Sequence, residues 1–310
     1  AVAGAATAIG ALTTKAIEGY AAQEQLVGGV ETLFKTSSDT VVGYANDAYK
    51  TAGMSANEYM ETVTSFSASL LASMNNDTAA AAEKANVAIT DMSDNANKMG
   101  TDISLIQNAY NGFAKQNYTM LDNLKLGYGG TKEEMQRLLD DASKLSGIKY
   151  DISSYSDVVD AIHVVQTEMG ITGTTAKEAS TTIEGSVSSM SSAWDNWVAG
   201  MADSEANFSQ LTSNLVDSIV TVVGNIAPRV IETVPRLVSG LGEIVEQLAT
   251  YIPQVIQELL PPLMSGVQDL LNTLVGMLPE MISIIGQIIP TIIDTLLTIL
   301  PQLLEAGVQI

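Results

Sequence analysis

Residues 279–305 read Pro-Glu-Met-Ile-Ser-Ile-Ile-Gly-Gln-Ile-Ile-Pro-Thr-Ile-Ile-Asp-Thr-Leu-Leu-Thr-Ile-Leu-Pro-Gln-Leu-Leu-Glu. Pro279, Pro290 and Pro301 recur every eleven residues, and the polar side chains between them are spaced 3, 4 and 4 residues apart. Such a cycle corresponds to about 3.67 residues per turn, so one face of an α-helix stays polar along its length. The stretch therefore predicts helices with one narrow polar face and a wide apolar face.

The same cycle can be followed back toward the N-terminus as far as Gln210, with Pro228, Pro261 and Gly276 as exceptions. We call these positions, from Gln210 to Gln309, the polar stripe. The members that we single out as candidate functional residues are Glu258, Asp269, Glu280, Gln287, Asp294, Thr298, Gln302 and Glu305. A continuous helix of about 100 residues would be roughly 150 Å long. Its apolar face is wider than a soluble surface helix normally buries, so partner helices or lipid must cover it.

Residues 281–304 carry one charge, Asp294, and are long enough to cross a bilayer. Asp294 would then need a polar interior or a water-filled lumen. Each interior proline removes a helical hydrogen bond and costs about 3 kcal/mol. The sequence therefore leaves open whether 210–310 is one rod or several hairpins, and whether the stripe lines a pore or covers the outside of a bundle.

The preceding part of the chain has a different composition, because all eight prolines lie at or after Pro228. Abundant Ala, Ser, Thr, Met and Asn with little strand-like alternation predict helices. The predicted helices span 55–75, 77–98, 102–125, 131–145, 156–169 and 174–200. We therefore predict an all-α fold, with a soluble Pro-free helical region over 1–209 and an apolar, Pro-punctuated, membrane-compatible region over 210–310.

Two predicted helices begin with a capping-box pattern, Ser55-Ala-Asn-Glu58 and Thr131-Lys-Glu-Glu134. In such a box the hydroxyl accepts from the third backbone N–H, and the Glu side chain accepts from the N–H of the cap residue. The glycine-rich run 127–130 precedes the second box, as in some phosphate-binding loops. However, no Gly-Lys-Ser/Thr and no apolar strand accompany it, which favours a plain connection between helices.

The composition excludes several classes of site. Without cysteine there is no disulfide framework, thiolate nucleophile or Cys-ligated metal, and a single histidine excludes a multi-His metal cage. The formal charge of −21 argues against specific or sequence-independent binding of nucleic-acid phosphates. We therefore predict no catalytic residues, no metal and no cofactor, and expect that the chain is not an enzyme.

Three local features each have two interpretations. His163 lies three residues from Asp160 and four from Thr167, which favours a hydrogen-bonded structural histidine over a catalytic one. Trp194 and Trp197 share a helix face, either as a packing anchor or as an interfacial aromatic belt. The small residues of 1–12 fit an Ala-rich helix of a soluble bundle or a close helix contact of the kind found in membranes.

Several longer segments resemble the core region of tail tape measure proteins from long-tailed (siphovirus-type) phages of Gram-positive bacteria. They are Gln25-Leu-Val-Gly-Gly-Val-Glu-Thr-Leu-Phe34, Ala48-Tyr-Lys-Thr-Ala-Gly-Met-Ser55, Ala88-Ile-Thr-Asp-Met-Ser-Asp-Asn-Ala-Asn-Lys-Met-Gly100, Gly112-Phe-Ala-Lys-Gln-Asn-Tyr-Thr-Met-Leu-Asp-Asn-Leu124 and Leu126-Gly-Tyr-Gly-Gly-Thr131. The resemblance covers roughly residues 17–200 and continues in the apolar, Pro-spaced tail. None of these motifs is catalytic, so the resemblance transfers no functional residue.

The resemblance implies a structural protein of the virion, packed as extended helices in the lumen of the tail tube or at the tail tip. Chain length would set tail length during assembly, and the protein would be released ahead of the DNA at infection. The implied partners are other copies of the chain, the tail tube and tail tip proteins, and the host membrane, through which the apolar region would form a conduit. The chain's ends also suggest an internal piece of a longer protein. An alternative is a secreted helical pore-forming or membrane-active protein, which the polar stripe would also suit.

Overall fold

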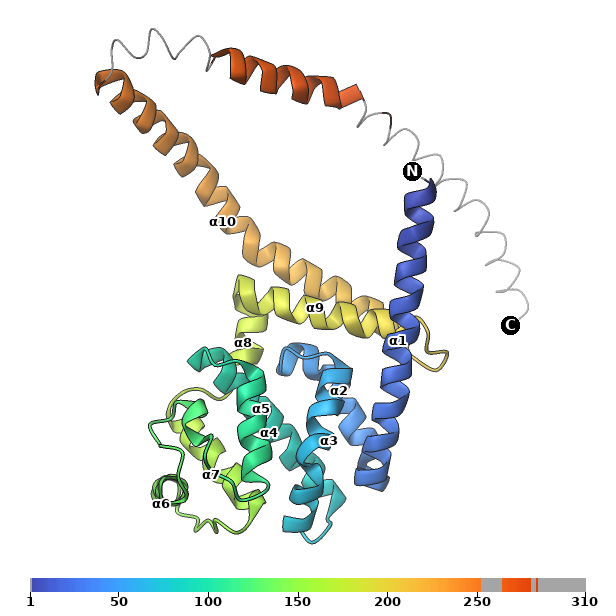
Figure 1. The fold of residues 1–310 in the computed structure, drawn as a ribbon, viewed down its shortest axis with the longest axis vertical. Helices are drawn as coiled ribbons and strands as arrows, with labels where there is room; N and C mark the ends of the chain where they lie inside the picture. The colour runs from blue at the N-terminus through green and yellow to red at the C-terminus, as the bar shows by residue number, and fades with distance from the viewer. Residues whose placement is uncertain (1, 252–263, 280–282, 284–310) are drawn as a thin grey trace, which may run out of the picture. The chain divides into compact units, whose positions relative to one another are not determined.

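The computed structural model describes residues 2–251, 264–279 and 283 (Figure 1). Within these residues the secondary structure is helical and there are no strands, so the predicted all-α fold is confirmed. The helices are α1 (Val2–Phe34), α2 (Ser38–Thr51), α3 (Ala56–Ser73), α4 (Thr78–Met99), α5 (Ile103–Phe113), α6 (Lys132–Ser146), α7 (Tyr155–Glu168), α8 (Thr174–Thr181), α9 (Ile183–Gly200) and α10 (Phe208–Tyr251). Two short 3₁₀ helices, Lys35–Ser37 and Leu121–Leu124, follow α1 and α5.

The chain divides into two units, Ala1–Ile231 and Glu232–Ile310. We call the first the N-terminal unit; it contains α1–α9 and the first part of α10. The packing thus groups residues 210–231 with the preceding helices. The separate roles that the sequence assigns to 1–209 and 210–310 stay a prediction.

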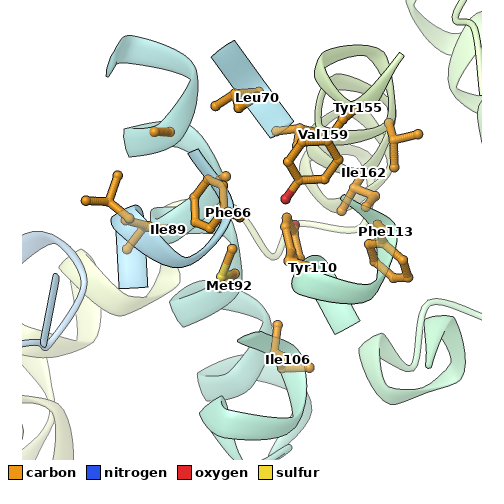
Figure 2. Close-up of a cluster of buried hydrophobic side chains, with 14 of the residues drawn as sticks. Phe66, Leu70, Ile89, Met92, Ile106, Tyr110, Phe113, Tyr155, Val159 and Ile162 are labelled. Atoms are coloured by element: carbon orange, nitrogen blue, oxygen red, sulfur yellow. The ribbon is translucent and has the colours of Figure 1, made fainter. Parts of the chain in front are cut away.

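Within the N-terminal unit, α1 packs against α2, α3 and α9, while α4 contacts α3, α5, α7 and α8 (Figure 1). The main core is a cluster of buried side chains from α1–α7 and the loops between them. Figure 2 shows part of it, with Phe66, Met92, Tyr110 and Tyr155 side by side. Alanines line much of the remainder: Ala81, Ala82, Ala85 and Ala88 of α4 are fully buried, which lets neighbouring helices approach closely.

Four of the six predicted helices are confirmed to within two residues at each end: α3, α4, α6 and α7. Ser55 forms the complete capping box with Glu58 that the sequence predicts. At α6 the Thr131 hydroxyl accepts from the Glu134 N–H, but the Glu134 carboxylate accepts from Gly129 N–H rather than from Thr131. The second box is therefore only half formed.

The predicted helix 102–125 is wrong, because α5 ends at Phe113. The N–H of Asn117 turns back to the Gly112 carbonyl at 2.9 Å, and Gln116 has φ of 57°. A Cβ on residue 112 would lie 2.9 Å from the Asn117 carbonyl oxygen, so the turn needs glycine there. The sequence signal was this glycine, which the predicted helix placed in its interior.

The predicted helix 174–200 is also wrong, because it is two helices, α8 and α9. Thr182 between them is extended, with φ −117° and ψ 156°, and its hydroxyl accepts from the Gly185 N–H at 3.0 Å. Gly185 lies directly against the backbone of Glu178, where a side chain would clash. Thr182 therefore acts as the N-cap of α9 at a sharp bend.

Two buried tyrosines provide a test of this core. The Tyr59 hydroxyl donates to Asn86 Oδ1 at 2.9 Å, whereas the buried Tyr155 hydroxyl has no hydrogen-bond partner among the described residues. We expect Tyr59→Phe to lower the free energy of unfolding by about 1 kcal/mol, because it removes a formed hydrogen bond. Tyr155→Phe removes a desolvated, unpaired hydroxyl and should be neutral or stabilising by about 1 kcal/mol. Urea unfolding of both variants measures the difference, and equal losses would contradict it.

Candidate functional site

Of the eight candidate stripe residues, the structure describes Asp269. It lies in a helical segment over 264–279, where its side chain is exposed and its carbonyl accepts from the Thr273 hydroxyl at 2.6 Å. The others, Glu258, Glu280, Gln287, Asp294, Thr298, Gln302 and Glu305, lie outside the described residues. Their prediction as one face of a helix stays a prediction.

The N-terminal part of the stripe is described, because it lies on α10. We call the side of α10 that faces helices α1–α9 the seat. Its members are Leu211, Asn214, Leu215, Ser218, Thr221, Val222 and Asn225. Three of them, Asn214, Thr221 and Asn225, belong to the polar stripe and are half-buried, whereas Gln210 and Asp217 of the stripe are exposed, so over 208–231 the stripe lies at the edge of the seat.

Hydrogen bonds and small side chains hold the seat. The Asn225 amide donates to the carbonyls of Thr182 at 3.1 Å and Ser180 at 3.4 Å, at the junction of α8 and α9. Leu211 packs against Gly200, and Leu215 lies in a small cluster with Tyr49 and Ala193. The sequence analysis did not predict this contact, because periodicity identifies the polar face of a helix but not its partner.

The tryptophan pair lies at the same place. The ring centroids of Trp194 and Trp197 are 5.3 Å apart, and Trp197 lies 5.5 Å from Phe208 at the start of α10. Trp197 Nε1–H also donates to the Thr212 hydroxyl at 3.0 Å. Within the described residues the packing-anchor interpretation accounts for Trp197, whereas Trp194 is 42% exposed and keeps an aromatic surface at the edge of the unit.

Opposite the seat, α10 presents an apolar surface to solvent. We call this the outer face; within the N-terminal unit it comprises Val216, Ile219, Val220, Val223 and Val230, which are 43% to 64% exposed. Beyond the unit boundary, α10 also exposes Val234, Leu237, Val238, Leu241 and Ile244. Scattered exposed apolar residues are ordinary, but a continuous row of them marks a surface that binds protein or lipid.

By length and composition, residues 208–244 qualify as a membrane-spanning helix, and in the described part of the chain they are alone in doing so. Buried core helices can pass the same test. Here only 17% of the most apolar window is buried in the protein, so the apolar character is not explained by a soluble core. The segment 264–279 is likewise exposed, with Leu270, Leu274 and Val275 each more than half accessible.

Two of the open cavities in the N-terminal unit are large. One, of about 580 Å³, is lined by α3–α5, α8, α9 and the loop after α2, and carries Glu58, Glu61 and Glu184 among amides and hydroxyls. The other, of about 710 Å³, lies between α1, α9 and the start of α10 and carries Glu18, Asp195, Asp203 and Glu205 beside one base, Lys15. Negative linings of this kind disfavour phosphate or nucleic-acid ligands. No group of three or more His, Asp or Glu side chains within the described ranges is placed to hold a metal ion.

The glycine-rich run 127–130 holds no free anion cradle. Its Gly129 N–H donates to Glu134 Oε2 at 3.0 Å, and the Arg137 guanidinium donates to the Gly127 carbonyl at 2.8 Å. The protein's own carboxylate therefore occupies the place where a phosphate oxygen would bind. This arrangement agrees with the interpretation of 127–130 as a plain connection.

His163 is hydrogen-bonded in the way that the structural interpretation expects. Its Nδ1 lies 2.9 Å from Oδ2 of Asp91, which is 1% exposed on α4. Burial raises the pKa of Asp91 to about 6, partly offset by the hydrogen bond from His163, and that bond raises the pKa of His163. Asp160 and Lys84 form an ion pair beside them. The Asp91–His163 pair thus joins α4 to α7.

One buried carboxylate has a role that the sequence analysis missed. Asp94, fully buried on α4, accepts from the backbone N–H groups of Gly173 at 2.5 Å and Thr175 at 2.8 Å. It thus caps the N-terminus of α8 from another helix, where negative charge is favourable. The spacing of Asp91 and Asp94, about one helical turn apart on α4, was the available signal, although Asp91 faces α7 and Asp94 faces the start of α8.

The Asp91–His163 pair predicts the pH dependence of stability. Both folded pKa values are raised, so the folded state binds more protons than the unfolded state, and stability falls as pH rises. For Asp91 the loss falls between its ordinary value of 3.8 and about 6, and for His163 it follows above 6.5. We expect Asp91→Asn to flatten the fall in melting temperature between about pH 4 and about pH 8.

The control is Asp141→Asn. Lys144 and Tyr128 lower the pKa of this carboxyl, so its contribution changes only in more acidic solution. The variant should keep the slope of the unmodified protein over the same range. A slope unaffected by Asp91→Asn would contradict the assignment.

Comparisons of the chain with protein-family models, with curated protein sequences and with solved structures gave no match. The geometry of α10 and the sequence motifs are therefore the basis for assigning a function. The most distinctive surface of the described chain lies on α10, whose seat contacts the preceding helices and whose outer face remains uncovered.

Proposed function

We propose that the chain is part of the tail tape measure protein of a long-tailed phage. In this proposal it is a structural, non-enzymatic protein inside the tail tube or at the tail tip, which sets tail length and leaves the particle at infection. Its apolar region then contacts the host membrane and forms a conduit for DNA. The motifs over 17–200 support the protein class, and the outer face of α10 is the single structural observation that supports the membrane step.

The outer face supports that step because it is continuous and exposed. Its side chains lie on the side of α10 opposite the seat, so lipid or apolar partner helices can cover them while the N-terminal unit stays in water. Burial of each valine or isoleucine is worth about 1.5–3 kcal/mol. Several such residues together provide enough free energy to hold a helix at or in a bilayer.

A change in chain length tests the structural role. Duplicating residues 221–242 adds two eleven-residue cycles in register, so the polar stripe is preserved across the insertion. If the segment is helical and acts as a ruler, tails should lengthen by roughly 33 Å. Electron microscopy of purified particles measures this length, and unchanged tails would remove the segment from the ruler. A matched particle with Ser213→Asp instead should keep its normal length.

Dye release from liposomes by the full chain tests the membrane role. Val220→Asp puts a charge on the outer face, where Val220 is 64% exposed, and should reduce release about tenfold or more. Ser213→Asp adds the same charge at an exposed polar position of the same helix and should change release less than about twofold. Absence of release by the unmodified chain from every lipid mixture tested would reject the membrane step.

A second candidate, a secreted helical pore-forming protein, is favoured by the same outer face. The two differ in where the chain is found. Mass spectrometry of purified virions should detect it if it is a tail protein. Detection in culture medium but not in particles would favour the toxin and reject the tape measure assignment.

A further inference from the structure

The contact between α10 and the rest of the N-terminal unit is narrow. Between Phe208 and Ile231, the buried side chains are Leu215, Ser218 and Val222, and one of these is polar. None of them belongs to the main core, which is built from α1–α7 and the loops between them. The core of the unit therefore does not depend on α10 for its own burial.

Cavities interrupt the seat at two places along the flank that carries the polar stripe. The cavity of about 710 Å³ reaches Gln210, Leu211 and Asn214. A second cavity, of about 170 Å³, lies between α10 and helices α2, α8 and α9, and reaches Asp217, Ser218 and Thr221. Protein interiors are normally close-packed, so these gaps remove the dispersion contacts that would otherwise fix the helix.

Water can replace the polar contacts between α10 and the preceding helices. Asn225 donates to two backbone carbonyls, and Trp197 donates to the Thr212 hydroxyl, all near the surface of the unit. When a helix leaves such a site, water takes over both donor and acceptor, so each bond contributes a modest net free energy, far below its gross strength. The opening of a segment like this costs less than global unfolding.

We propose that residues 208–231 of α10 form a releasable strap, which detaches as one piece from α1–α9 while those helices stay folded. Release uncovers Asn214, Thr221 and Asn225 of the polar stripe. It also makes the seat available to partners, in addition to the outer face. The proposal concerns packing within this unit and holds whether or not the chain is a phage tail protein.

The chain carries its own reporter for this motion, because its two tryptophans, Trp194 and Trp197, both lie beside the strap. We expect tryptophan fluorescence of the full chain to change at a lower urea concentration than the loss of amide-exchange protection in α3 and α4. The free energy of the tryptophan transition should also depend less steeply on urea concentration than that of global unfolding, because strap release exposes less surface. Coincident transitions would overturn the proposal.

A pair of variants separates strap release from local loosening around the tryptophans. Asn225 lies at the end of the seat away from the tryptophans. Asn225→Ala should therefore shift the tryptophan transition to lower urea concentration, because it raises the equilibrium constant for strap release about fivefold to tenfold. Val216→Ala, on the outer face, should change it less than about twofold. If Asn225→Ala leaves the tryptophan transition unmoved, or destabilises α3 and α4 equally, the strap does not leave as a unit and the proposal fails.

Discussion

The eleven-residue period of α10 is the constraint on which its surroundings depend. Because the period stays close to that of an α-helix, the same side of α10 faces the preceding helices from Leu211 to Asn225. The opposite side therefore remains apolar from Val216 to Val230. A pattern that drifted around the helix would have divided the outer face into separate patches.

The N-terminal unit is organised to need little from α10. Its helices approach one another through small side chains, as at Ala45 and Ala48 of α2 and Ala85 of α4, all fully buried. Where this core buries charge, backbone N–H groups or a histidine satisfy it, as for Asp94 and Asp91. Helices α1–α9 are thus closed around their own core, and the first part of α10 is attached to their surface by a few contacts.

How much could be predicted from the sequence depended on the range of each interaction. The cap formed by Ser55 and Glu58 spans three residues, so its local pattern was sufficient. The bend at Thr182 arises from an approach of Gly185 to Glu178, and Asp94 caps a helix about 80 residues away. These contacts form between helices, and neither composition nor periodicity specifies which helices meet. The seat of α10 belongs to the same class, since the stripe identified its polar flank but not its partner.

The charge of the protein restricts what can cover the outer face. With a formal charge of −21, the chain is repelled by an anionic lipid surface, and both large cavities add carboxylates near the helices that carry α10. Electrostatic attraction therefore cannot hold α10 to such a membrane. In the proposed membrane step, binding would have to come from apolar burial, and it would strengthen with added salt, which screens the repulsion. The outer face, from Val216 to Val230, remains available for that burial.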